Sequence, residues 1–114
     1  MGAGGPPEGG TFVEAVVDRR AELRNRRELP RIMERLYPDA LKAAGIGGRV
    51  VVQFVVDTNG RIDMSTVKVM SSDHDGLVDA TRRALGEFRF SPARMGDRSV
   101  RMLTQMPIVW QVEN

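Results

Sequence analysis

The chain has 114 residues and a net charge of +2; 41% of the residues are hydrophobic, 28% are charged and only 5% are aromatic. This length and composition predict one globular domain whose core consists of Val, Ile, Leu and Met. The lack of cysteine excludes a disulfide framework, a thiolate metal site and a cysteine nucleophile. A lone histidine, His74, excludes a multi-histidine metal site within one chain.

The first ten residues have the composition of a linker. They read GAGGPPEGG after Met1, which predicts a flexible Gly/Pro linker stub or a cloning remnant over residues 1–10. No apolar run approaches the roughly 20 residues needed to span a membrane, and no signal peptide is visible. We therefore expect any targeting or anchor segment of the native protein to lie outside this chain.

Residues 11–35 are expected to form an N-terminal strand and an arginine-rich connector. The segment from Thr11 to Asp18 is rich in β-branched residues, which favour strands. Residues 19–35 hold seven of the 15 arginines, and Pro30 is expected to interrupt any helix there. We interpret the connector as a solvated surface; the alternative is a patch that binds nucleic acid or another anionic surface.

The main domain is predicted over residues 36–114 and begins with a helix. Residues 37–44 (YPDALKAA) carry Pro38 at the first helical position, where its missing N–H costs nothing. Gly45 follows as a C-terminal stop. The three glycines between residues 45 and 48 follow a helix and precede a strand, so we interpret them as a tight turn and not as a phosphate-binding loop.

A β-hairpin is the strongest prediction in the chain. Residues 49–57 (RVVVQFVVD) are apolar on both faces, which is typical of a central strand. Asn59-Gly60 predicts a tight turn to a partner strand over residues 61–71. The apolar phase of that strand switches near Ser65-Thr66, which indicates a β-bulge.

A second helix and a long last strand complete the predicted fold. The polar loop 72–75 can cap a helix over residues 76–88, whose apolar stripe consists of Leu77, Thr81, Ala84, Leu85 and Phe88. Residues 102–112 alternate as a strand, and Pro107 indicates a sheet edge or a bulge, because proline has no N–H for a ladder. This order predicts an α+β fold: an antiparallel three-stranded sheet with two helices on one face, plus a short N-terminal strand.

Catalytic and metal-binding patterns are missing from the sequence. Ser71 to Asp75 are consecutive residues, whereas a nucleophilic triad assembles from separate places in the chain. The aspartates between residues 57 and 79 do not have the alternate spacing of a calcium loop. We therefore expect no enzyme activity, no cofactor and no metal, and we expect His74 to be an exposed loop residue.

The last strand is the best candidate for a binding site. A free sheet edge can take up an extended peptide, whose backbone then hydrogen-bonds to the edge. The alternative is a protected edge, because proline itself discourages strand pairing.

Five motifs in order carry a resemblance to a known family. They are Tyr37-Pro38 before a helix, the GIGGRV start of the first long strand, the FVVDTNGRI hairpin, VKVMSS with FRFSPA around the second helix, and MPIVW in the last strand. From about Leu36 to Val112 the chain resembles the TonB C-terminal domain. It departs from the family's Gln-Pro-x-Tyr-Pro motif, because the corresponding residues are Glu34-Arg35-Leu36-Tyr37-Pro38.

The resemblance implies a binding function in energy transduction. TonB proteins are anchored in the inner membrane and work with ExbB and ExbD, driven by the proton gradient. Their periplasmic C-terminal domain captures the TonB box of an outer-membrane receptor as an added strand, for active uptake such as siderophore transport. The partner-binding residues implied here are Tyr37 and Pro38 together with Met102, Leu103, Thr104, Gln105, Met106, Ile108, Val109, Trp110, Gln111 and Val112.

Three alternatives remain open at the level of sequence. The same domain can be reused in another envelope protein as an interaction module. The arginines of residues 19–35 can bind nucleic acid, and an exposed edge can pair with its own copy to form a homodimer.

Overall fold

Three antiparallel strands form the centre of the sheet in a computed structural model that describes residues 10–112. Strand β3 (Gly48–Val56) lies between β4 (Ile62–Ser72) and β7 (Arg98–Trp110). This arrangement confirms the predicted three-stranded antiparallel sheet and the central position of β3. The linker is predicted over residues 1–10, of which residues 1–9 lie outside the described residues.

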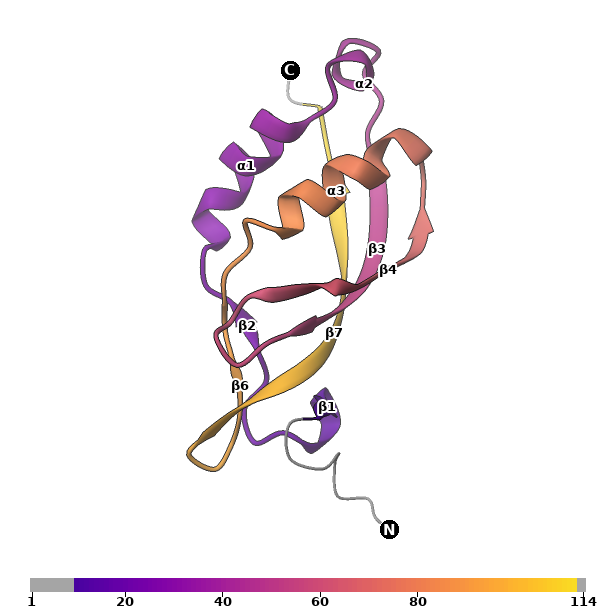
Figure 1. Ribbon diagram of the computed structural model, residues 1–114. Helices are drawn as coiled ribbons and strands as arrows, with labels where there is room; N and C mark the ends of the chain where they lie inside the picture. Colours follow the sequence, from indigo (N-terminus) through magenta and orange to yellow (C-terminus); the bar gives the residue numbers. More distant parts are fainter. Residues whose placement is uncertain (1–9, 113–114) are drawn as a thin grey trace.

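Two short strands extend the sheet beyond the prediction. β1 (Thr11–Val13) pairs in parallel with β7, and β6 (Ala93–Met95) pairs with the start of β7 across a tight turn at Gly96. This turn explains why β7 begins at Arg98, four residues before the predicted start. Figure 1 shows β7 running along the length of the sheet.

The hairpin between β3 and β4 forms as the sequence predicts. The Asp57 carboxylate accepts hydrogen bonds from the backbone N–H groups of Asn59 (2.8 Å) and Arg61 (3.0 Å). Gly60 has a φ of +84°, a backbone conformation that is strained for any residue with a side chain. The backbone oxygen of Gly60 accepts a hydrogen bond from Phe90 N at 2.7 Å, so the turn is held against the rest of the fold.

The predicted bulge lies in β4. Gln53 is opposite Lys68 and Val55 is opposite Asp63, so one residue of β3 faces residues 64–67 of β4. The Thr66 hydroxyl takes the place of a ladder partner, because it accepts a hydrogen bond from Val55 N at 2.9 Å.

The helical layer covers one face of the sheet. α3 (Val78–Leu85) follows a single 3-10 turn, η3 (Asp75–Leu77), and is shorter than the predicted span because the chain leaves the helix at Gly86. All five residues of its predicted apolar stripe are fully buried. His74 is half-buried rather than exposed, and its Nδ1 accepts a hydrogen bond from Gly76 N at 2.9 Å that caps the 3-10 turn.

The segment before Tyr37 differs most from the prediction. The N-terminal strand ends at Val13, where a 3-10 turn, η1 (Glu14–Val16), begins. A further 3-10 turn, η2 (Arg26–Glu28), leads into a helix that was not predicted, α1 (Leu29–Leu36). Pro30 does not interrupt this helix but lies in its first turn, where backbone N–H groups have no intrahelical partner. Figure 1 places α1 and α3 on the same side of the sheet.

The predicted helix after Tyr37 forms as α2 (Asp39–Ala43). It is shorter than residues 37–44, because Tyr37 and Pro38 are both extended, with Pro38 preceding the helix instead of starting it.

The arginine-rich connector is paired to the chain after α3. β2 (Glu22–Leu23) pairs with β5 (Phe90–Ser91), and the Asn25 side chain bonds to Glu87 O and Arg89 N at 2.9 Å each. All seven arginines between residues 19 and 35 are exposed, as predicted for a solvated surface.

The hairpin turn yields a first prediction, which concerns glycine at two positions with positive φ. A Cβ at Gly60 would lie 1.9 Å from the backbone oxygen of Phe90, whereas one at Gly96 (φ +61°) would meet nothing within 4 Å. We expect Gly96→Ala to lower the free energy of unfolding by about 1–2 kcal/mol through backbone strain alone. Gly60→Ala should lower it by about 3 kcal/mol or more. Equal losses in urea denaturation would contradict the docking of the hairpin on Phe90.

Candidate functional site

One side of β7 is free along seven residues. On its first side β7 pairs with β3 from Met102 to Trp110. On its second side it pairs with β1 only from Arg101 to Leu103. From Thr104 to Trp110 no described strand pairs with that second side, so this part of β7 is an edge, as Pro107 predicted.

The missing N–H of Pro107 fixes the direction of the backbone groups. Pro107 lies opposite Val51, so its N–H position points away from β3 toward the free side. Because directions alternate along a strand, Gln105 and Val109 also point their N–H and C=O groups to the free side. The backbone oxygen of Trp110 points to the β3 side: it would lie 2.3 Å from a Cβ built on Gly47, the residue before β3.

The side chains of this edge alternate between a buried and an open face. Ile108 and Trp110 are 4% and 1% exposed and lie under the helical layer. Val109 is 49% exposed on the opposite face, and Gln105 and Pro107 are exposed beside it. A strand added to this edge would therefore find apolar surface on both sides of its plane.

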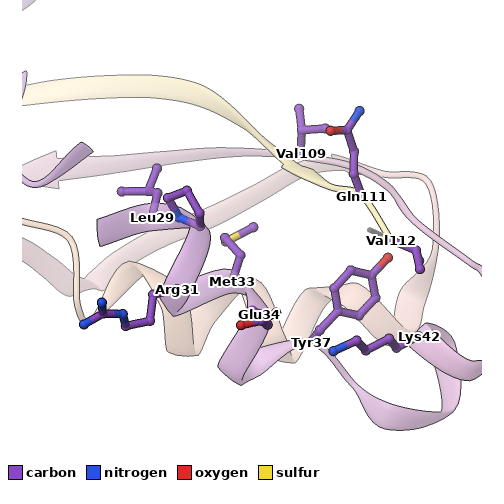
Figure 2. A pocket seen from close by; sticks show the side chains of 10 residues that line it. Leu29, Arg31, Met33, Glu34, Tyr37, Lys42, Val109, Gln111 and Val112 are labelled. Carbon is purple, nitrogen blue, oxygen red and sulfur yellow. The ribbon is translucent and has the colours of Figure 1, made fainter. Parts of the chain in front are cut away.

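A groove lies between α1 and the end of β7. It has a volume of about 670 Å³ and is lined by Leu29, Pro30, Arg31, Met33, Glu34, Tyr37, Lys42, Val109, Gln111 and Val112. Figure 2 shows the α1 side chains on one side and the three β7-end residues on the other. Among the predicted site residues, the structure thus brings Tyr37 together with Val109, Gln111 and Val112.

A second hollow borders the earlier part of the same edge. It has a volume of about 470 Å³ and lies between residues 102–106 and the segment from Glu14 to Arg26. The Thr104 hydroxyl oxygen is buried there without a hydrogen-bond partner among the described residues. Met102 and Leu103 lie where the edge is already occupied, since Met102 is 2% exposed and Leu103 is opposite Val13 of β1.

Tyr37 anchors the floor of the groove to the core. Its hydroxyl donates to Ile46 O at 2.6 Å, and its ring meets the Trp110 ring edge-on at 5.3 Å. Burial raises the pKa of the Tyr37 phenol. Pro38 is not among the groove residues but lines a separate hollow, which Asp79 and Ala80 of α3 also line.

A hydrogen-bond chain fixes Trp110 beneath the edge. The indole N–H donates to the Thr81 hydroxyl at 2.9 Å, and that hydroxyl donates to Leu77 O at 2.7 Å. Thr81 is fully buried on α3, so the end of β7 is tied directly to the helical layer.

An ion pair crosses the open face of the sheet. Arg101 on β7 donates to the Asp63 carboxylate on β4 at 2.9 Å, with Val55 of β3 between the two strands. The Ser65 hydroxyl also donates to Asp63, at 2.7 Å. These two donors, Ser65 first, lower the pKa of the Asp63 carboxyl.

The groove wall was missed by the sequence analysis. Leu29, Ile32, Met33 and Leu36 have the i, i+3, i+4 spacing of a buried helix face, which was a usable signal. Pro30 in this run predicts an interruption instead, and the structure shows that it lies in the first turn of the helix. Within residues 10–112 there is no cluster of three metal-binding side chains and no helix long and apolar enough to cross a membrane.

The fold and its candidate site define a class of protein: a two-layer α+β domain with a free edge strand bordered by a groove. Residues 33–112 match the family described as the Gram-negative bacterial TonB protein C-terminal. The chain belongs to this family, whose members are interaction proteins and not enzymes. The resemblance inferred from the sequence and the expectation of no enzyme activity are thereby confirmed.

Two relatives from Pseudomonas aeruginosa support this assignment. The chain is 37% identical to Protein TonB over 73 residues, which are 62% of this chain and 21% of that protein. It therefore spans about a fifth of the length of this relative. The solution NMR structure of the TonB C-terminal domain aligns with a TM-score of 0.56 and 32% identity, covering 68% of this chain and 78% of that one.

The Trp110 hydrogen bond gives a second prediction. Thr81→Val keeps the volume of the side chain but leaves the indole N–H unsatisfied, which should lower the free energy of unfolding by about 1–3 kcal/mol. In a Trp110→Phe background the donor is gone, so the same substitution should cost less. Both effects can be measured by denaturant unfolding. The same cost in both backgrounds would mean that the bond does not stabilise the end of β7.

The Asp63 cluster gives a third prediction, on pH. A carboxyl whose pKa is lowered on folding stabilises the fold above the ordinary aspartate value of 3.8, and the contribution is lost as pH falls through the folded value. The wild type should therefore be more stable than Asp63→Asn at pH 7, with the gap closing below pH 3.8. In a Ser65→Ala background, the difference in stability between Asp63 and Asp63→Asn at pH 7 should be smaller. A gap that does not change with pH in urea titrations would rule out a contribution from the charge.

Proposed function

We propose that this chain is the periplasmic C-terminal domain of a TonB-type energy transducer, and that it binds the TonB box of outer-membrane receptors. The observation that carries the proposal is the unpaired side of β7 between Thr104 and Trp110. Membership of the TonB C-terminal family supports it.

Binding occurs by strand addition. Gln105 and Val109 each offer an N–H and a C=O, and Pro107 offers only a C=O to the incoming strand. Each backbone hydrogen bond contributes a net 0.5 to 1.5 kcal/mol or so, part of which is offset by ordering the peptide. Side-chain contacts must supply the rest of the affinity.

Energy transduction would require this periplasmic domain to be tethered to the inner membrane. ExbB and ExbD act on segments outside this chain, and the proton gradient supplies the energy for uptake, including siderophore transport. Force on the captured strand would act first on β7. This strand is paired with β3 at nine positions, from Trp110 opposite Gly48 to Met102 opposite Val56. This long ladder distributes the load over the centre of the sheet.

Two of the alternatives would use the β7 edge and one would use the arginines of residues 19–35. A homodimer would use the β7 edge of two copies, and a reused domain would bind another envelope protein there. Nucleic-acid binding draws less support, because Arg20 pairs with Glu14 and Glu22 and Arg35 pairs with Glu87.

The test is NMR of labelled protein titrated with synthetic TonB-box peptides from receptors of the same genome. We expect saturable shifts along residues 104–110. In hydrogen exchange, the amides of Gln105 and Val109 should gain protection on binding, whereas those of Ile108 and Trp110 should be protected already, because they face β3.

A substitution pair separates backbone capture from side-chain contact. Val109→Pro removes a free-side N–H without touching a β3 bond, so binding should weaken about tenfold or more, whereas Val109→Ala keeps the N–H and should bind more nearly like the wild type. If no peptide alters these amides in the folded domain, the transducer proposal fails. Light scattering that shows a dimer through β7 would favour self-pairing instead.

A further inference from the structure

The alternation of side chains determines what a captured strand presents to the domain. Directly opposite residues of paired strands point to the same face, in parallel and antiparallel pairs alike. Residues of the added strand opposite Pro107 and Val109 would therefore lie on the open face. Those opposite Ile108 and Trp110 would point to the helical side, whichever way the strand runs.

The α1 groove lies beside this end of the edge: α1, in the helical layer, forms one wall, and Val109, Gln111 and Val112 border it from the end of β7. Leu29 and Met33 are spaced by four residues, so they lie along one face of α1, and Tyr37 follows directly after the helix; together the three form an apolar wall. Val112 completes the wall from the end of β7 (Figure 2). At about 670 Å³ the groove has room for more than one side chain.

The rim of the groove is charged. Arg31 and Lys42 carry positive charges and Glu34 one negative charge, and all three are exposed. Two cations against one carboxylate disfavour a lysine or arginine of the partner at this place. The groove therefore complements an extended segment that is apolar where it enters and not basic at its flank.

We propose that this groove is a specificity pocket of the β7 edge, and that Leu29 and Met33 select captured strands by the apolar side chains opposite Ile108 and Trp110. The proposal rests on the proposed strand capture at β7. Both residues are half-buried against the core, so a ligand side chain can reach them without unfolding α1. The flexible thioether of Met33 adapts to branched or aromatic side chains.

The probes are synthetic TonB-box peptides with a single substitution at the position facing the groove: Ala, Leu, Phe or Lys. Binding to the full chain is measured by calorimetry. The wild type should bind the Leu peptide about tenfold more tightly than the Ala peptide, and the Lys peptide most weakly. Met33→Ala should reduce the Leu-over-Ala preference to about threefold or less, with little change for the Ala peptide.

Two control variants guard against indirect effects. Met70→Ala removes a methionine that is 49% exposed on β4, at the other edge of the sheet, and should leave every affinity unchanged. Leu29→Ala tests the same wall from the first turn of α1 and should also narrow the preference. For each variant, unchanged spectra of Ile108 and Trp110 show that the edge is folded.

The outcomes separate this inference from the function on which it rests. If Gln105 and Val109 gain protection but all four peptides bind alike, strand capture stands and the pocket is overturned. The pocket is also overturned if Met33→Ala and Met70→Ala change the preference equally. If no peptide protects the edge amides, strand capture fails and the pocket inference fails with it.

Discussion

The missing N–H of Pro107 governs the candidate site, because it fixes which backbone groups of β7 point to the unpaired side. Proline cannot donate to β3, so residue 107 turns its backbone to the free side, and Gln105 and Val109 turn with it. The residues between them complete the ladder to β3. The same proline also leaves one donor absent from the free edge, which discourages indiscriminate pairing while keeping the edge open to a matched strand.

The packing below the edge follows from this arrangement. Trp110 faces the helices and is held by Tyr37 on one side and by the Thr81 hydroxyl of α3 on the other. The end of α1, the middle of α3 and the end of β7 therefore meet at one buried indole. Because Tyr37 directly follows α1, its contact with Trp110 ties the end of that helix to the end of β7.

The elements that could be predicted from sequence are those whose signals are local. The β3–β4 hairpin follows from Asn59-Gly60, and the edge position of β7 follows from Pro107. The groove could not be found in this way, because it depends on α1 lying beside β7, a contact between segments some 75 residues apart in the chain. Pro30 shows a different failure, since a proline ends or begins a helix according to context that one window does not contain.

The N-terminal segment limits the length of the free edge. β1 occupies β7 at Arg101–Leu103, so a captured strand can pair only from Thr104 onward and would lie end to end with β1 on the same side of β7. A pull between the N-terminal segment and the captured strand would then run along β7 and load its hydrogen bonds in shear. Bonds loaded in shear share the force, whereas bonds peeled from one end break in turn. Under the strand capture proposed above, the pairing of β1 on β7 would therefore suit a domain that holds its partner under tension.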